Sequence, residues 1–236
     1  MLLYIIRHGE PDYATDSLTE NGRKQANALA DRLCTHGFDE IYSSPLGRAM
    51  QTAQPTCERL KLQYKIEDWM SEDTAWKDFS VADDNGVRNW AFSCQNTKLI
   101  DRDYTGADWH TNPVFQSCES ASGGYNRIRN CSDDFLACLG YKRDGKLYKV
   151  ITPNEKRVAA FCHHGFGTTW LSHLLSIPPN FFWSGFDIAH SSVTILIFRN
   201  NPDGYTAPQC VCLSDVSHIY KEKLPLNAAI KFFDNH

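Results

Sequence analysis

The sequence contains no long hydrophobic run. A helix that crosses a membrane needs roughly 20 predominantly apolar residues, and no segment of the 236 residues approaches that length. The first residues also lack the basic stretch and the long apolar stretch of a secretory signal peptide. These absences predict a cytoplasmic protein with no membrane partner.

Positive charge is scarce as well. The formal net charge is -4 at pH 7, and no basic run is long enough to bind a polyanion. Proteins that bind nucleic acids or anionic membranes through their overall charge carry a basic patch or stripe. We therefore expect no nucleic-acid partner.

Regular cysteine spacing is missing too. The nine cysteines are an odd number and lie scattered along the chain, which indicates reduced thiols when no signal peptide is evident. Cys210 and Cys212 form a close pair in a predicted strand, but a zinc site needs further ligands at suitable spacing. Packing is the favoured role of this pair and metal binding is the alternative. No motif indicates a metal or another cofactor.

Internal repeats, low-complexity linkers and domain boundaries are also absent, so the chain is expected to form one domain over residues 1–236. Between about 74 and 118 the periodicity of helices and strands fades, and aromatic residues recur instead. A segment of this length inside a compact domain usually forms a functional cover or an insertion. We expect a lid there, whose aromatic side chains cover a site, pack the segment onto the core, or do both.

The rest of the sequence alternates strand patterns with helix patterns. Leu2–Ile6 is a run of apolar β-formers, typical of a strand that is buried on both faces of a parallel sheet. Further strands are predicted over 38–43, 63–66, 147–152, 157–162, 192–199 and 205–213, and helices after Thr19 as N-cap, after Ser44 and Pro45, over 119–139, over 168–175 and from Leu226. A tight turn is expected to join the strands over 147–152 and 157–162. This alternation predicts an α/β fold.

Charged and imidazole side chains follow three of these strands. Arg7 and His8 end the first strand, Arg48 opens the helix after the second, and His163 and His164 follow a later apolar strand. Each group by itself could be a solvated strand end. Because ligands bind at the carboxyl ends of the strands in open α/β sheets, we expect the three groups to meet, with the N-termini of two helices nearby. Guanidinium groups hold phosphate oxygens and imidazole attacks phosphorus, so the combination indicates a phosphate pocket.

The chain resembles the histidine phosphatase superfamily, which includes the cofactor-dependent phosphoglycerate mutases. The resemblance rests on four motifs in the family's order: Arg7-His8-Gly9-Glu10; Leu18-Thr19 with Gly22 and Gln25-Ala26; Ser43-Ser44-Pro45-Leu46 with Arg48-Ala49 and Gln51-Thr52-Ala53; and His164-Gly165 after an apolar strand. It implies a three-layer sandwich with a mostly parallel central sheet flanked by helices. It also implies metal-independent hydrolysis of a small phosphomonoester through a phosphohistidine on His8, with Arg7, Arg48 and His164 holding the phosphoryl oxygens.

Two residues are assigned by weaker patterns. The family's second histidine directly precedes glycine, so we choose His164 over its neighbour His163, which we expect to face away from the phosphate. Met70-Ser71-Glu72 resembles the turn that supplies the family's general acid, so Glu72 is the expected proton donor. Asp73 and Asp68 are the alternatives.

The predicted lid favours a phosphatase over the alternative, a phosphoglycerate mutase. The asparagine that closely follows the first motif in mutases is missing, and the segment has no adjacent pair of arginines. Its aromatic content suggests a partly apolar leaving group. Trp90 and Trp109, with Phe92 and Tyr104, are candidate substrate contacts, and packing is the alternative role for each. A protein that only binds phosphorylated ligands is disfavoured because the pocket residues are all present.

Overall fold

A computed structural model describes residues 1–83, 85–94, 99–100, 106, 108–118 and 120–225. Its main sheet has six strands in the order β13-β11-β1-β10-β4-β5. The strands are β1 (Leu2–Arg7), β4 (Glu40–Ser43), β5 (Tyr64–Ile66), β10 (Arg157–Cys162), β11 (Val193–Ile197) and β13 (Gln209–Asp215). Strands β1, β10, β4 and β5 are parallel neighbours, whereas β11 runs antiparallel to β1 and to β13. The predicted, mostly parallel sheet is confirmed.

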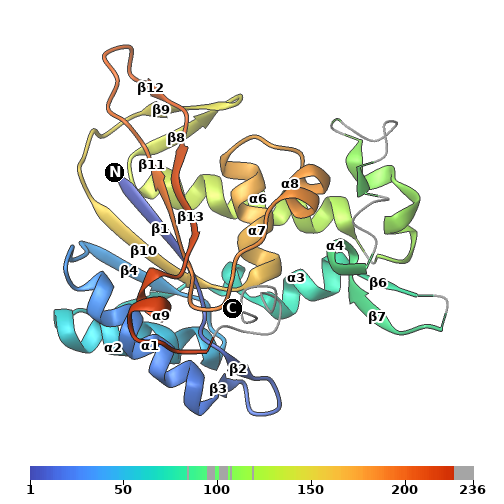
Figure 1. Ribbon diagram of the computed structural model, residues 1–236. Helices are drawn as coiled ribbons and strands as arrows, with labels where there is room; N and C mark the ends of the chain where they lie inside the picture. Colours follow the sequence, from blue (N-terminus) through green and yellow to red (C-terminus); the bar gives the residue numbers. More distant parts are fainter. Residues whose placement is uncertain (84, 95–98, 101–105, 107, 119, 226–236) are drawn as a thin grey trace.

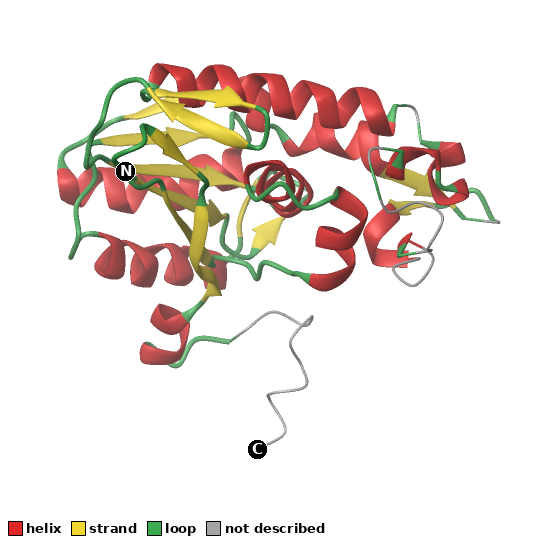
Figure 2. Cartoon of the chain, turned by 90° about the horizontal axis from the view of Figure 1, so that it is seen from above, coloured by secondary structure: helices red, strands yellow, loops and turns green. Residues whose placement is uncertain are grey.

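Helices cover both faces of this sheet (Figures 1 and 2). The long ones are α1 (Glu20–Leu33), α2 (Gly47–Leu60), α6 (Ala121–Cys138) and α7 (His164–Leu174). Alternate side chains of β1 enter two separate cores. Tyr4 and Ile6 pack with apolar residues of α1 and α2, and Leu3 and Ile5 pack with those of α6 and α7. The result is the expected three-layer sandwich.

The three strand ends meet at one edge of the sheet. Arg7 pairs with Cys162 in register, and Ser43 pairs with Phe161. The residues that follow β1, β10 and β4 are therefore adjacent in space. Thr19 caps α1 as predicted and accepts a hydrogen bond from the Gly22 amide. Helix α2 begins at Gly47, slightly later than the Ser44-Pro45 signal predicted.

A second, three-stranded antiparallel sheet contains β8 (Tyr141–Asp144), β9 (Leu147–Val150) and β12 (Tyr205–Thr206). Strands form within both predicted ranges, 147–152 and 157–162, but they lie in different sheets, since β9 pairs with β8 and β12 while β10 lies in the main sheet. The two strands also differ in burial: β10 is buried along nearly its whole length, whereas only one of the four residues of β9 is buried. The strand predicted over 205–213 is split at Pro208, which has no N–H for a ladder.

The segment predicted as a lid lies beside the sheet layers, at the right of Figure 1. It contains α3 (Glu72–Phe79), β6 (Ser80–Ala82), β7 (Arg88–Trp90), α4 (Ala91–Cys94), η3 (Trp109–Thr111) and η4 (Pro113–Ser117). Helix α3 begins two residues before the predicted boundary at 74. Tyr104, Glu119 and the helix predicted from Leu226 lie outside the described residues.

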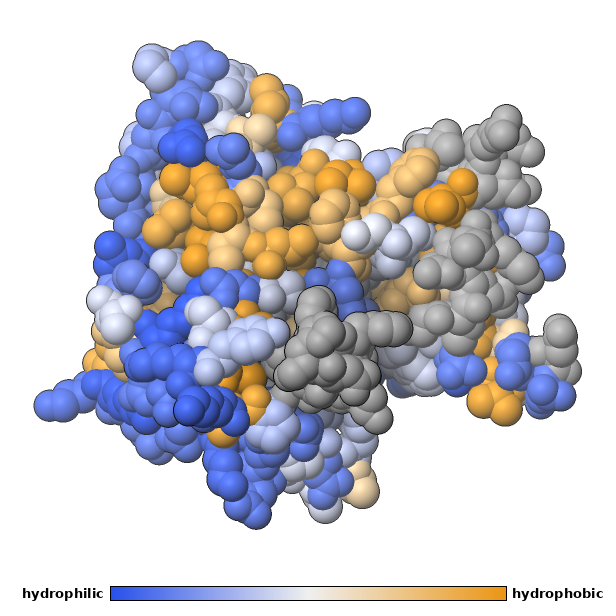
Figure 3. Space-filling model, viewed as in Figure 1, coloured by the Kyte–Doolittle hydropathy of each residue, from blue (hydrophilic) through white to orange (hydrophobic). Residues whose placement is uncertain are grey.

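The remaining short elements connect these parts. They are β2 (Pro11–Asp12), β3 (Ser17–Leu18), η1 (Asp68–Met70), α8 (Pro179–Gly185) and α9 (Ser217–Lys221). Within the described part of the chain, no helix has both the length and the apolar character to cross a bilayer. The face in Figure 3 is hydrophilic at its left and lower edges, and apolar side chains gather across its upper middle.

Candidate active site

His8 lies at the end of β1 and is 2% exposed. Its Nδ1 is 2.7 Å from the Gly9 carbonyl oxygen. A carbonyl oxygen can only accept, so Nδ1 carries the proton and Nε2 has a free lone pair. Burial, the His163 ring and the Arg7 guanidinium together lower the pKa of His8 well below its usual value of 6.5. At neutral pH His8 is therefore a neutral imidazole, the form that can attack an electrophile.

The loop after His8 is held against α1 and α2 by residues of the first three motifs. The Gly9 amide donates to Thr52 Oγ1 at 3.0 Å, and the Glu10 amide donates to Gln25 Oε1 at 2.8 Å. A Cβ on Gly22 would lie 2.1 Å from the Glu10 carbonyl oxygen, so only glycine permits this approach of α1 to the loop. These contacts fix the position of the His8 ring.

In both arginines, hydrogen bonds from the terminal Nη atoms hold the guanidinium group in place. Arg7 donates from Nη1 to the Ile188 carbonyl and from Nη2 to His190 Nε2, each at 2.6 Å. Arg48 donates to Asp16 Oδ1 at 2.6 Å. The buried Nε atoms of Arg7 and Arg48 have no hydrogen-bond partner among the described residues. They are donors available to an anion.

His190 is a site residue whose role the sequence did not reveal. Its ring centroid is 5.3 Å from that of His8, and its Nε2 accepts the Arg7 hydrogen bond. Burial, with Arg7 nearby, lowers the pKa of His190 to about 2, which keeps the ring neutral and able to accept. The only sequence signal was its place just before a predicted strand.

The structure separates the two adjacent histidines. His163 is fully buried, its backbone is extended (φ -132°, ψ 179°), and its ring centroid is 5.1 Å from that of His8. Its Nε2 contacts Ser44 Oγ at 2.7 Å, while its buried Nδ1 has no partner among the described residues. The expectation that His163 faces away from His8 is wrong, because His163 continues β10 directly beside β1.

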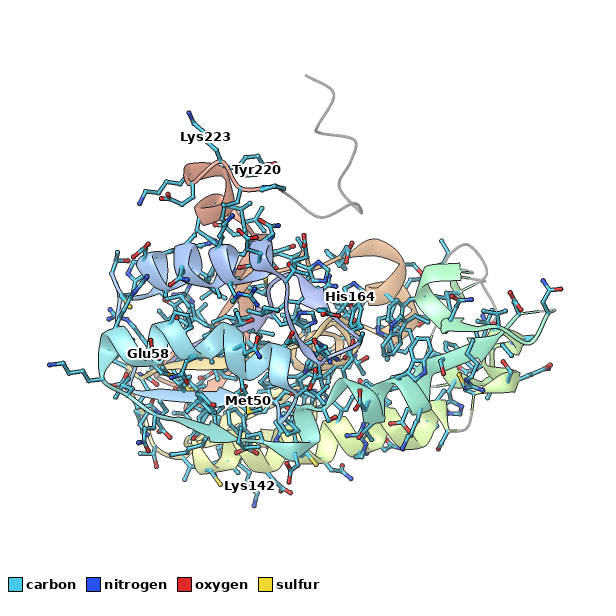
Figure 4. The ribbon with its side chains drawn as sticks, turned by 90° about the horizontal axis from the view of Figure 1, so that it is seen from below. Met50, Glu58, Lys142, His164, Tyr220 and Lys223 are labelled. Carbon is cyan, nitrogen blue, oxygen red and sulfur yellow. The ribbon has the colours of Figure 1, made fainter. Side chains whose placement is uncertain are left out.

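His164 is the first residue of α7 and lines the cavity rather than packing on His8. Its Nε2 lies 2.5 Å from Asp187 Oδ1, and its ring centroid is 5.3 Å from that of Phe92. Figure 4 shows His164 between the layers of the sandwich and the segment that carries β6 and β7. Both histidines therefore reach the site, at different positions.

Glu72, the expected proton donor, begins α3 and crosses to the N-terminus of α7. Its Oε1 and Oε2 accept from the amides of Gly165 and Phe166, each at 2.8 Å. At α2, the Gly47 amide donates to Asp16 Oδ2 in the same way. The helix ends expected to face a phosphate are thus occupied by carboxylates, and side chains supply the free donors.

A cavity of about 1060 Å³ opens above these groups. The residues that line it are Arg7, His8, Tyr13, Asp16, Leu46, Arg48, Glu72, Asp73, Trp76, Trp90, Phe92, His164, Trp183, Ser184, Gly185, Phe186 and Asp187. Of the expected substrate contacts, Trp90 and Phe92 line it.

Two predicted candidates lie elsewhere. Trp109 is 3% exposed and packs against Phe115, Tyr125 and Trp183, so its expected role as a substrate contact is replaced by packing. Asp68 is exposed in η1 and does not line the cavity, whereas Asp73 does. Within the described ranges, no cluster of three or more possible metal ligands is present.

A neutral buried imidazole with a free Nε2, beside two guanidinium groups with unpartnered donors, suits nucleophilic attack on phosphorus. Comparison with known proteins agrees with this chemistry. A model of the histidine phosphatase superfamily (branch 1) matches residues 3–116. Phosphoserine phosphatase 1 of Hydrogenobacter thermophilus is 27% identical over 212 residues, which are 84% of this chain and 88% of that protein.

Two solved structures of phosphatases share the fold. A mutant of phosphoserine phosphatase from Entamoeba histolytica, in complex with phosphoserine, has a TM-score of 0.61 at 21% identity, covering 92% of this chain and 98% of its own. Mycobacterial glucosyl-3-phosphoglycerate phosphatase has a TM-score of 0.60 at 21% identity, covering 90% and 98%. Over residues 3–116, which hold the first three of the four motifs, the chain is thus similar to the histidine phosphatase superfamily.

Proposed function

We propose that this protein is a metal-independent phosphomonoesterase that works through a phosphohistidine on His8. The observation that carries the proposal is the hydrogen bond from His8 Nδ1 to the Gly9 carbonyl, which leaves Nε2 as the free base on the cavity floor. The phosphatases among its relatives support hydrolysis as the overall reaction.

The reaction has two steps. His8 Nε2 attacks phosphorus, the bond from phosphorus to the ester oxygen breaks, and the leaving oxygen takes a proton from Glu72. Water then attacks the phosphohistidine and gives its proton to the Glu72 carboxylate, while the bond between phosphorus and Nε2 breaks. Ester and water become alcohol and phosphate. Each Glu72 oxygen accepts one amide hydrogen bond and keeps a second lone pair for the proton.

We assign the phosphoryl oxygens to Arg7, Arg48 and His163. The Nε atoms of both arginines and Nδ1 of His163 are buried and unpartnered in the described part of the chain. The His163 ring centroid is 5.1 Å from that of His8, and burial, with the charges of Arg48 and Arg7, lowers the pKa of His163, so the ring is neutral. His164, the residue chosen from its glycine neighbour, instead takes a place on the cavity wall with Asp187.

The chain acts as one domain over residues 1–236 in this proposal, and the segment 74–118 covers the floor. Trp76, Trp90 and Phe92 of that segment line the cavity. A mutase would need cations for the carboxylate and second phosphate of its substrate. Arg7 and Arg48 are the only Arg or Lys residues among the lining residues that the structure describes, which favours hydrolysis over phosphoglycerate isomerisation.

Phosphate release from a panel of monoesters, measured with EDTA and with product analysis for 3-phosphoglycerate, tests the proposal. We expect EDTA-resistant release that falls at least about 10⁴-fold in His8→Ala. His36→Ala is the matched control, because His36 is exposed and does not line the cavity. Isomerised 3-phosphoglycerate with little free phosphate would contradict the proposal, as would hydrolysis that survives the loss of His8.

A further inference from the structure

The cavity walls differ in chemistry from its floor. Beyond Arg7, His8 and Arg48, the walls hold the aromatic side chains of Trp76, Trp90, Phe92, Trp183 and Phe186. The centroid distances are 4.8 Å for Trp76–Trp90, 5.1 Å for Trp90–Phe92 and 5.5 Å for Phe92–Trp183. Trp76, Trp90, Phe92 and Trp183 thus form a continuous aromatic wall, which His164 extends through its contact with Phe92.

Negative charge accompanies the aromatic wall. Asp73 lines the cavity beside Glu72, is exposed, and makes no hydrogen bond or ion pair with any residue that the structure describes. Asp187 also lines the cavity, and the His164 hydrogen bond is the largest influence that lowers the pKa of Asp187 to about 2. No lysine or third arginine among the described lining residues balances these two carboxylates.

The wall and its carboxylates favour some phosphate esters over others according to the charge and shape of the alcohol part. A second anionic group on the substrate would face carboxylates and the negative faces of aromatic rings, without a cation to pair with. An ammonium group would meet indole faces and the free Asp73 carboxylate, and a flat apolar body would stack on the wall. We propose, on the basis of the phosphomonoesterase function above, that the preferred substrate is the phosphate ester of an aromatic alcohol that carries an ammonium group and no second anion.

Three aryl esters test this class, because their phenol leaving groups are nearly alike and only the remote charge differs. They are the phosphate esters of tyramine, of para-ethylphenol and of para-hydroxyphenylpropanoate, with positive, neutral and negative side chains. We expect kcat/KM to fall in that order, by about tenfold between the positive and the neutral ester. Phosphoethanolamine should likewise be hydrolysed faster than phosphoserine, which differs by one carboxylate.

The variant Asp73→Asn removes the negative charge of Asp73 and so measures what that charge contributes to substrate preference. It should bring the kcat/KM ratio between the tyramine and ethylphenol esters down toward one, while Asp68→Asn, an exposed acid outside the cavity, keeps the ratio of the unmodified protein. An equal loss on all three esters in Asp73→Asn would assign Asp73 to proton transfer or folding and overturn its role in recognition.

The failure of this inference is distinguishable from that of the phosphomonoesterase proposal. If hydrolysis depends on His8 but the anionic ester is hydrolysed best, or all three equally, the substrate class is wrong and the phosphomonoesterase proposal stands. If no ester shows hydrolysis that depends on His8, both proposals are contradicted.

Discussion

The floor and the wall of the cavity are built by different means. The floor is formed where β1, β4 and β10 end, and hydrogen bonds from His8, Arg7 and Arg48 to fixed neighbours set its geometry. The wall comes from the segment 72–94 and from α8, and ring contacts and the short β6–β7 pair hold it rather than the main sheet. In the proposed function the floor carries out the reaction and the wall selects its substrate.

Glu72 belongs to the segment that forms the wall and is the proposed proton donor for the reaction on the floor. Its substitution therefore tests whether the reaction needs a group from the wall segment. In Glu72→Gln we expect kcat to fall by about 10² to 10⁴, because the leaving oxygen loses its proton donor. The loss should be smaller for aryl esters, whose phenols leave more readily, and steady-state rates on aryl and alkyl esters measure it.

Asp68→Asn serves as the control for Glu72→Gln, since Asp68 was an alternative proton donor and is exposed outside the cavity. Its rates should match those of the unmodified protein. A larger loss in Asp68→Asn than in Glu72→Gln would move the acid to η1 and contradict the assignment.

Of the two adjacent histidines, His163 belongs to the floor and His164 to the wall. His163→Ala should lower kcat by about 10² to 10³, the usual effect of losing one donor to a transition-state oxygen. His164→Ala should lower kcat less and change KM more, because it contacts Phe92 and Asp187 on the wall. Steady-state kinetics of the two variants measure these effects, and thermal unfolding checks that both variants fold. A larger loss of kcat in His164→Ala than in His163→Ala would assign the phosphoryl oxygen to His164 instead.

The titration of His8 is a further test of the floor. Its pKa lies below 6.5 in the folded protein, so Nε2 stays unprotonated as the pH falls through 6.5 and is protonated only at lower pH. We expect ¹⁵N NMR to show a neutral ring with the proton on Nδ1 at pH 6.5, where an ordinary imidazole is half protonated. The missing signal in His8→Ala assigns the resonance, and a midpoint near 6.5 would show that the ring is not desolvated as described.

The smallest expected effect concerns the wall alone. Trp76→Leu removes the edge contact with Trp90, and KM for aryl esters should rise about threefold to tenfold with little change in kcat. The exposed Tyr220 in α9 supplies the control Tyr220→Leu, which should leave KM unchanged. A fall in kcat as large as that of His163→Ala would show that floor and wall are not separable.

The floor was largely predictable because short sequence signals determine it. Leu2–Ile6 is apolar on both faces, so it had to lie inside the sheet, and parallel pairing then brought Arg7, Arg48 and the two histidines to one edge. The sequence could not decide between His163 and His164, because the choice depends on the residue at which the extended backbone ends and α7 begins. Extended backbone carries His163 on toward His8, and α7 begins at His164, four residues earlier than its periodicity indicated.

The wall could not be predicted because its contacts join distant and weakly patterned segments. Gly165 and Gly167 disfavour a helix, yet both lie in α7. A Cβ on Gly165 would lie 2.6 Å from the Trp90 ring, so glycine is what lets Trp90 pack against this turn. Aromatic composition alone cannot separate Trp90, which lines the cavity, from Trp109, which is buried. Strand β8 was missed because Tyr141–Asp144 is mostly polar and exposed.

Direct detection of the phosphorylated intermediate tests the central claim most closely. A substrate labelled in its phosphoryl group is mixed with the protein, the reaction is quenched in alkali within milliseconds, and the peptide that contains His8 is examined by mass spectrometry. We predict an acid-labile phosphoryl group on His8 Nε2, and none in His8→Ala. Full turnover without label on His8 in the unmodified protein would contradict the account.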